Sequence, residues 1–255
     1  MTGNPLDLDR LPTPGAGFVW RLFGDALALV PETDAVSAVF TTRVGGTSDG
    51  PFASWNMSFA VGDEHDRVAA NREAANEAIG RPGAASWGRV RQVHGTDVVA
   101  WHADGDLRPA DGLWTDDPAH VLGAFGADCL PVLFEGPERI ATAHAGWRGL
   151  VAGVVEAAAK AADATHAWIG PGIGPCCYEI GEDAAAPIRE RFGAQAVTDG
   201  RGDLWFAARS AAQAAGVEHV HSADLCTSCN LGLYFSHRRD KGVTGRQALV
   251  AAIAR

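Results

Sequence analysis

The string Thr142-Ala143-His144-Ala145-Gly146-Trp147-Arg148-Gly149 combines side chains that can bind a metal and an anion. It follows an apolar stretch typical of a buried strand and opens a stretch with helical spacing. A histidine at such a turn can ligate a metal, while an arginine beside free helix N–H groups can bind an anion. Arg148 is therefore a candidate for a catalytic role and for binding phosphate or another anionic part of a substrate.

Two further strings offer matching metal ligands. Gln92-Val93-His94-Gly95 and Ala127-Asp128-Cys129-Leu130 each follow an apolar segment. With His144 they supply two imidazoles and a thiolate, which suits a catalytic zinc with one coordination position left open. The spacings are long and match no metal motif, so each histidine taken alone is better explained by an ordinary place in the core or a loop.

Neighbouring residues strengthen the hypothesis of a site. Gly95 and Gly146 flank the two histidines, where a glycine permits a tight turn or a close approach to a ligand. Asp128 lies among apolar residues, and a buried carboxylate must be paired or poised for chemistry. It is our candidate for a general acid or base. Cys129 has a second interpretation, as a nucleophile activated by one of the histidines.

Other polar residues give weaker signals. Arg43 lies in the glycine-rich loop Thr41-Thr42-Arg43-Val44-Gly45-Gly46, which suits a phosphate clamp but also an ordinary surface arginine. Cys226-Thr227-Ser228-Cys229 has no second pair at zinc-finger spacing, so we assign these thiols no ligand role. Cys176-Cys177 are adjacent and cannot easily bridge each other. His219-Val220-His221 is weak evidence for copper, because blue copper needs a more complete ligand set.

The bulk composition limits the classes of partner. The 255-residue chain has a formal net charge of −10, with 47% hydrophobic and 20% charged residues. An acidic surface argues against nucleic acid or an anionic membrane as the main partner, although a local basic pocket can still bind a small anion. Five cysteines, an odd number, and an N-terminus without a signal-peptide pattern predict a reduced, cytoplasmic protein. No apolar run approaches the roughly 20 residues that a membrane span needs.

The hydrophobic pattern predicts a flexible tail over residues 1–17 and one catalytic domain over residues 18–255. Strands and helices are mixed without strict alternation, which favours an α+β layered sandwich with mixed β-sheets. The expected strands span 36–42, 121–134 with interruptions near Gly126 and Pro131, 140–144, 167–170, 217–220 and 247–253. Residues 90–93 and 97–101 suggest a hairpin. Helices are expected over 63–79, through Leu150–Ala158, and over 182–192 and 203–215.

Taken together, these strings resemble the YfiH-like family, also called multicopper polyphenol oxidoreductase or laccase-like. This family looks like the group of purine nucleoside phosphorylases that is unrelated to the classical purine nucleoside phosphorylases. The match spans about residues 36–253 and rests on a consistent order of motifs. They are Thr42-Arg43-Val44-Gly45-Gly46-Thr47-Ser48, Ser54-Trp55-Asn56-Met57-Ser58, Val61-Gly62-Asp63, Asn71-Arg72, the strings around His94, Cys129 and His144, Gly170-Pro171, Cys176-Cys177-Tyr178-Glu179, Phe235-Ser236-His237-Arg238-Arg239-Asp240 and Thr244-Gly245-Arg246.

The resemblance implies a single domain with an α/β/β/α layered fold and one zinc held by His94, Cys129 and His144. It implies phosphorolysis of adenosine, inosine, guanosine and methylthioadenosine, together with deamination of adenosine. Some bacterial relatives are linked to editing of peptidoglycan precursors. Among the residues of its motifs, Arg43, Asn56, Gln92 and Arg148 are the expected substrate-binding set. One departure is Asn56-Met57-Ser58, where the family usually has Asn-Leu-Gly, and it puts the details of that loop in doubt.

Three classes of function therefore compete. The first is a zinc purine nucleoside phosphorylase with a nucleoside and phosphate as partners, acting as a monomer or homodimer. The second is a hydrolase that uses Cys129 with a histidine, for instance on peptidoglycan precursors. The third is a laccase-like copper oxidase. Nine scattered histidines are too few for several copper centres, so zinc is favoured over copper.

Overall fold

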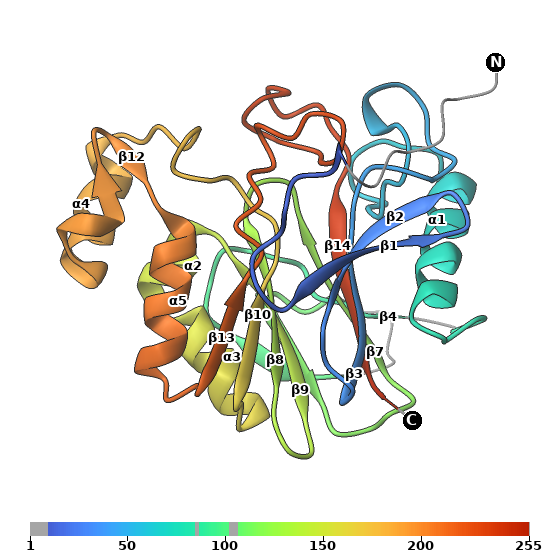
Figure 1. Cartoon of the computed structure of the whole chain (residues 1–255), viewed down its shortest axis with the longest axis horizontal. Coiled ribbons are helices and arrows are strands. Elements are labelled where there is room, and N and C mark those ends of the chain that lie inside the picture. Colours follow the sequence, from blue (N-terminus) through green and yellow to red (C-terminus); the bar gives the residue numbers. More distant parts are fainter. Residues whose placement is uncertain (1–9, 85–86, 102–106, 255) are drawn as a thin grey trace.

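Two six-stranded sheets lie at the centre of the protein (Figure 1). The computed structural model describes residues 10–84, 87–101 and 107–254. The first sheet has the order β1 (Phe18–Phe23), β2 (Ala26–Pro31), β3 (Val36–Thr41), β14 (Gln247–Ile253), β7 (Val121–Gly126) and β4 (Trp87–Gly88). The second has the order β13 (His219–Ser222), β10 (His166–Ile169), β8 (Leu130–Glu135), β9 (Ile140–Ala145), β6 (Gly112–Thr115) and β5 (Val98–Ala100).

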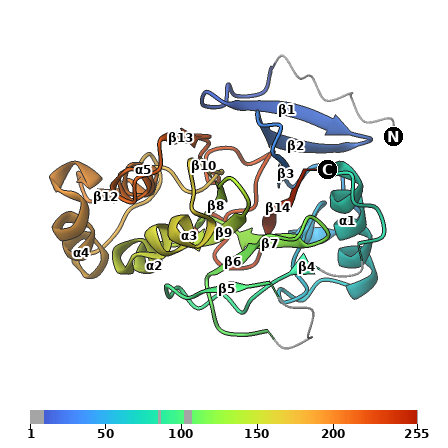
Figure 2. The same cartoon turned by 90° about the horizontal axis from the view of Figure 1, so that it is seen from below.

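Helices cover the outer faces of both sheets (Figure 2). They are α1 (His65–Ala78), α2 (Trp147–Ala152), α3 (Val154–Ala162), α4 (Glu182–Phe192) and α5 (Leu204–Ala214). A short antiparallel pair, β11 (Val197–Thr198) and β12 (Arg201–Gly202), accompanies α4. Most strand pairs are antiparallel, but β4 with β7, β5 with β6 and β10 with β13 are parallel. The predicted mixed sheets are confirmed.

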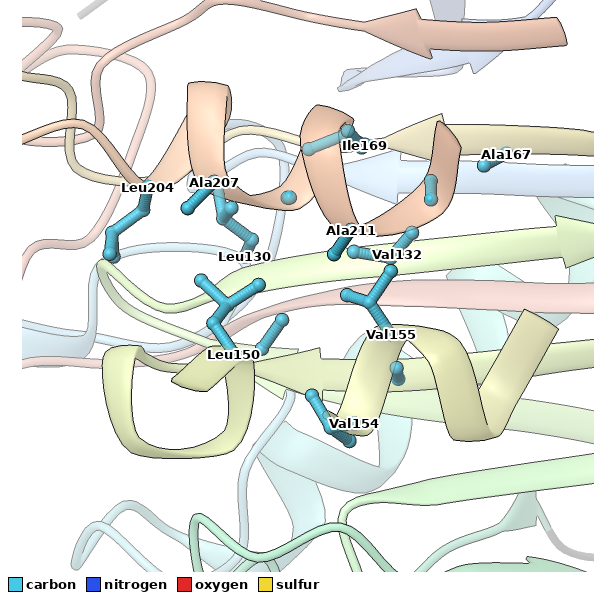
Figure 3. Close-up of a cluster of buried hydrophobic side chains, with 14 of the residues drawn as sticks. Leu130, Val132, Leu150, Val154, Val155, Ala167, Ile169, Leu204, Ala207 and Ala211 are labelled. Atoms are coloured by element: carbon cyan, nitrogen blue, oxygen red, sulfur yellow. The ribbon is translucent and has the colours of Figure 1, made fainter. Parts of the chain in front are cut away.

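Three buried clusters define the layers. Phe40, Leu249 and Leu133 belong to the cluster between the two sheets. A second cluster joins the first sheet to α1. The third joins the second sheet to α2–α5, where β8 and β10 present Val132 and Ile169 to helices with alanine-rich faces (Figure 3). Burial of this apolar surface on both sides of each sheet is the main term that favours the layered fold. The expected α/β/β/α arrangement is therefore confirmed.

Two elements, α4 and β14, have the bounds that the sequence predicted, and most of the other expected strands and helices differ from the prediction by one or two residues at an end. The helical stretch through Leu150–Ala158 is divided into α2 and α3, because Gly153 adopts a positive φ of 106°. The apolar stretch 121–134 forms two strands that belong to different sheets. The chain crosses from the first sheet to the second at residues 127–129, so this crossover carries Asp128 and Cys129.

Two sequence-based expectations need correction. The hairpin over 90–93 and 97–101 is wrong, because β5 pairs with β6 and Arg91 forms only an isolated bridge with Pro109. The N–H groups of residues 93–95 donate to the side chain of Asp111 instead of to a facing strand. The strands β1 and β2 were not predicted. Gly24-Asp25 between two apolar runs was the signal that marks their two-residue turn.

Residues 10–17 belong to the segment predicted to be a tail. Two hydrogen bonds join this segment to the rest of the protein. The Trp20 indole donates to the carbonyl of Pro12, and the N–H of Gly15 donates to the carbonyl of Ala223. Residues 1–9 lie outside the described part of the chain, and the domain boundary at 17/18 stays a prediction. Within the described residues, no helix has both the length and the apolar composition that crossing a membrane requires.

The contact between the sheets predicts a destabilising substitution at Gly170, which follows β10. A Cβ there would lie 2.3 Å from the Phe40 ring in the core between the sheets. Gly170→Ala should therefore lower the free energy of unfolding by about 1–3 kcal/mol, as overpacking of a core does. Gly232→Ala is the matched control, since no atom lies within 4 Å of its Cβ position. Equal stability of the two variants in urea unfolding would contradict the account.

Candidate metal centre and its cationic cavity

The structure brings His94, Cys129 and His144 together from three separate segments. His144 is in β9, Cys129 is in the crossover between the sheets, and His94 is in the turn that precedes β5. Their potential ligand atoms all lie within 4.8 Å of one another. Sγ of Cys129 is 3.8 Å from Nε2 of His94, and the two imidazole centroids are 4.9 Å apart. The three residues that the sequence singled out as metal ligands are therefore neighbours.

The buried carboxylate of Asp111 organises this cluster. It accepts hydrogen bonds from the backbone N–H groups of Val93, His94 and Gly95, at 2.6 Å for Gly95. It also lies 2.9 Å from Nδ1 of His144, and the N–H of His144 donates to the carbonyl of Asp111. A carboxylate on Nδ1 fixes the ring orientation and leaves Nε2 as the nitrogen available for a metal. Asp111 thus holds both histidines of the candidate metal site in place.

The charges within the cluster favour an ionised thiol. Burial opposes ionisation of Cys129, but His144 and His94 outweigh it and lower its pKa to about 6. Burial likewise opposes protonation of His144, but the Cys129 thiolate and Asp111 raise its pKa to about 9. Hydrogen bonds from His144 and Gly95 hold the pKa of Asp111 below its ordinary value despite burial. A thiolate is the form of cysteine that binds metals and attacks electrophiles.

Gly146 keeps the cluster open on one side. A Cβ at this position would lie 2.8 Å from Cδ2 of His94 and 3.0 Å from Sγ of Cys129, so a larger residue would displace two potential ligands. Gly95 is different, because its Cβ would make an ordinary contact at 3.5 Å. Two imidazoles and one thiolate are a donor set that zinc accepts. The residues present therefore fit a zinc ion.

The cluster opens into a cavity of about 950 Å³. His94, Cys129 and His144 line it together with the aromatic rings of Phe59, Phe125 and Tyr178. Six basic side chains also line it, and Asp128 contributes the one carboxylate among the described lining residues. The six are Arg72, Arg89, Arg91, Arg238, Lys241 and Arg246. In a chain with a formal net charge of −10, this concentration of positive charge favours an anionic ligand.

Arg72 is the most perturbed of these cations. Burial and then the like charge of Arg89 lower its pKa to about 9. Its guanidinium lies 4.3 Å from the Phe59 ring centroid and 5.0 Å from that of Phe125, and it donates twice to the carbonyl of Met57. Within the described residues it forms no ion pair with a carboxylate. A bound anion would supply the negative charge that Arg72 lacks as a partner within the described residues.

Asp128 connects the crossover to the loops around the cavity. Its carboxylate accepts from the Thr227 hydroxyl and from the N–H of Arg238, both at 2.7 Å. The carbonyl of Asp128 accepts from the N–H of Ile173. The residue adopts a φ of 99°, which is uncommon for a residue with a side chain. These contacts hold Cys129 in place, and the general acid or base role of Asp128 stays a prediction.

The other predicted substrate-binding residues have structural partners. Gln92 lines the cavity, but its amide exchanges two hydrogen bonds with the main chain of Phe125. Arg43 donates to the carbonyls of Ala53 and Leu231, and it lies outside the described lining residues. Arg148 is exposed, with its guanidinium 4.4 Å from the Trp147 ring centroid. The substrate roles of all three stay predictions.

Asn56 is buried and lies outside the described lining residues of the cavity. Its amide donates to Asp63, and its carbonyl oxygen accepts from the N–H of Arg246. It therefore positions Arg246, and its proposed contact with substrate stays a prediction. Sequence reasoning did not single out Asp111, although an acid at the start of an apolar strand was a signal. Arg72 and Arg246 lie in motifs that resemble the family, but the sequence alone assigned neither of them a role.

Comparison with known proteins identifies the family. The model of the family described as multi-copper polyphenol oxidoreductase laccase matches residues 37–254. This α/β/β/α protein with a His-Cys-His cluster therefore belongs to that family. The purine nucleoside phosphorylase YfiH of Escherichia coli strain K12 is 37% identical over 235 residues, covering 86% of this chain and 94% of that protein.

Other relatives agree with this assignment. The purine nucleoside phosphorylase YlmD of Geobacillus stearothermophilus is 35% identical over 246 residues, covering 85% of this chain and 89% of its own. The crystal structure of YlmD from that organism has a TM-score of 0.83 at 32% identity and covers 93% of this chain and 100% of its own. A YfiH protein from Bacillus licheniformis gives a TM-score of 0.83 at 31% identity, covering 92% of this chain and 98% of its own.

The packing at Gly146 predicts a selective loss of metal. Gly146→Ala should weaken zinc binding at the His94 cluster by at least about tenfold, because the new methyl group displaces two ligands. Gly95→Ala should bind zinc as the wild type does, since its methyl group fits. Competition with a coloured chelator measures both affinities. Equal zinc affinity in the two variants would show that Gly146 does not protect the cluster.

The pKa of Cys129 predicts the pH dependence of its alkylation. In protein stripped of metal, carboxamidomethylation of Cys129 should be half-maximal near pH 6 and slow below it, because the thiol is then protonated. Mass spectrometry of the Cys129 peptide follows the rate separately from the other cysteines. In His144→Ala the midpoint should move upward, since the imidazolium is gone. A wild-type midpoint near 9, the ordinary value, would refute the ion pair.

Proposed function

We propose that this protein is a zinc-dependent purine nucleoside phosphorylase. The observation that carries the proposal is one cavity that combines a His-Cys-His cluster, aromatic rings and six basic side chains. The names of the relatives support the same activity. We extend the proposal to adenosine, inosine, guanosine and methylthioadenosine as substrates, to deamination of adenosine, and to action in the cytoplasm.

Phosphate binds among the cavity arginines in this proposal. Arg246 donates to the carbonyls of Thr244 and Gly245, and Arg238 donates to the carbonyl of Glu179. Neither forms an ion pair with a carboxylate within the described residues, so each can donate further N–H groups to an anion. Several guanidinium groups suit a phosphate, because each presents a planar fork of donors.

The nucleoside binds against the aromatic part of the same cavity. The ring centroids of Phe59 and Phe125 both lie within 5.0 Å of the Arg72 guanidinium. Tyr178 adds a third ring, and burial raises the pKa of its hydroxyl to about 12, so the hydroxyl stays a hydrogen-bond donor at neutral pH. A purine offers a flat face to such rings and polar edges to the donors.

Phosphorolysis needs few chemical groups from the chain. A phosphate oxygen bonds to C1′ as the glycosidic C1′–N9 bond breaks, and the base leaves with a proton. The arginines hold the phosphate on one face of the sugar, so the attack is effectively unimolecular. A zinc ion, when bound, would supply Lewis acidity at the cluster end of the cavity. Asp128 is our candidate to move the proton, and Arg148 remains a candidate for holding the anion.

A second candidate function rests on the thiolate of Cys129. A cysteine with a pKa of about 6 beside His144 and His94 has the pairing of a nucleophilic hydrolase. A copper oxidase is less well supported. His94, Cys129 and His144 form the one cluster of metal donors with histidine found in the described residues, whereas laccase chemistry needs several copper centres. Phosphate dependence and metal content separate these functions.

The decisive assay is product analysis with and without phosphate. Purified protein with inosine and phosphate should yield hypoxanthine and ribose 1-phosphate, and base release should stop when phosphate is removed. Chromatography of the base and the sugar phosphate measures both products. Base release that proceeds equally without phosphate would favour the hydrolase and exclude the phosphorylase.

Variants locate the phosphate in the same assay. Arg246→Ala should raise the KM for phosphate about tenfold or more, since it removes a charge-assisted hydrogen bond. Arg189→Ala, in α4 and outside the described lining residues of the cavity, is the matched control and should leave the KM unchanged. Arg148→Ala tests the sequence-derived role of that residue by the same criterion. An unchanged phosphate KM in Arg246→Ala would remove this arginine from the proposed site.

A further inference from the structure

Four of the five cysteines form a second cluster, separate from the His94 cluster. Cys176 and Cys177 come from the loop after β10, and Cys226 and Cys229 come from the loop after β13. Their sulfur atoms all lie within 4.8 Å of one another. Sγ of Cys229 is 3.3 Å from Sγ of both Cys176 and Cys177. The adjacent pair and the Cys-x-x-Cys pair, which looked isolated in the sequence, therefore converge.

Backbone donors are directed at the buried member of the cluster. The N–H of Gly174 lies 3.3 Å from Sγ of Cys226, and the N–H of Cys229 lies 3.5 Å from the same atom. Hydrogen bonds from N–H groups stabilise a thiolate more than a thiol. Within the Cys226–Cys229 turn, the N–H of the last residue therefore points back to the sulfur of the first. The two N–H donors thus favour the thiolate form of Cys226, which is the form that binds a metal cation.

The cluster joins two loops that carry parts of the cavity wall. Between β13 and β14 the structure has no regular element over residues 223–246, and so long a segment in a folded domain needs anchors. Gly172 bridges Cys226, and Thr227 donates to Asp128 beside Cys129. Tyr178 follows Cys177 directly, and Arg238 lies further along the second loop. A cross-link between these two loops would hold Tyr178 and Arg238 in place.

We propose that Cys176, Cys177, Cys226 and Cys229 bind a structural zinc ion as four thiolates. In a tetrahedral site with Zn–S bonds of about 2.3 Å, the sulfurs lie about 3.8 Å apart. The observed separations are close to this value. They suit one ion rather than an iron–sulfur cluster, whose several irons spread the cysteine sulfurs further apart. All four ligand positions come from the protein, as in structural zinc sites, so this ion has no catalytic role.

Metal analysis of the full chain tests the proposal. Protein purified under reducing conditions without added metal should contain two zinc ions per chain. The double variant Cys226→Ser, Cys229→Ser should retain one, and so should His144→Ala, which removes a ligand of the other cluster. Ser228→Ala changes a side chain between the two cysteines without removing a thiol, so it should retain two. Elemental analysis against protein concentration gives these values.

Cobalt substitution isolates the second cluster from the first. In His144→Ala, Co²⁺ should produce intense sulfur-to-cobalt charge-transfer absorption from several thiolates, and Cys229→Ser in that background should weaken it. If Cys226→Ser does not fold, the single variants Cys176→Ser and Cys229→Ser still test the proposal, because both of these cysteines are exposed. The proposal is overturned if His144→Ala retains no zinc. It is equally overturned if peptide mapping finds a disulfide from Cys229 to Cys176 or Cys177 in place of a metal.

Discussion

The candidate active centre depends on one buried carboxylate. Asp111 receives three consecutive backbone N–H groups around His94 and a hydrogen bond from His144. Left unpaired at this depth, a charged carboxylate would be strongly unfavourable, so these donors are required by the fold itself. Their positions in turn fix the two histidines beside Cys129. The same interaction therefore stabilises the turn at 93–95 and builds the geometry of the candidate metal site.

The two-sheet architecture determines where this centre lies. Because β7 and β8 belong to different sheets, the three residues between them cross the layer boundary and place Cys129 at the end of both sheets. Asp128 anchors the crossover to the loop over residues 223–246 through Thr227 and Arg238. That loop and the segment around Arg72 then surround the cluster with positive charge. An acidic protein thereby presents a local basic cavity, which suits a phosphate-consuming enzyme.

Sequence reasoning reached the layered fold and the His94, Cys129 and His144 cluster, because apolar periodicity and flanking glycines are local signals. It predicted a hairpin at 90–101, since only tertiary structure shows that Asp111 replaces the facing strand. It did not foresee the four-cysteine cluster, because the two cysteine pairs are distant in the sequence and meet only where β10 and β13 run side by side. Long-range contacts of this kind leave no short-range pattern.

The most direct test of this account is the zinc affinity of the His94 cluster in Asp111→Asn. We expect the affinity to fall about tenfold to a hundredfold relative to the wild type, because the amide cannot accept all of the donors that orient the two histidines. Asp183→Asn, an exposed position in α4, is the matched control. Circular dichroism establishes that both variants are folded. A folded Asp111→Asn protein that binds zinc as tightly as the control would contradict the account.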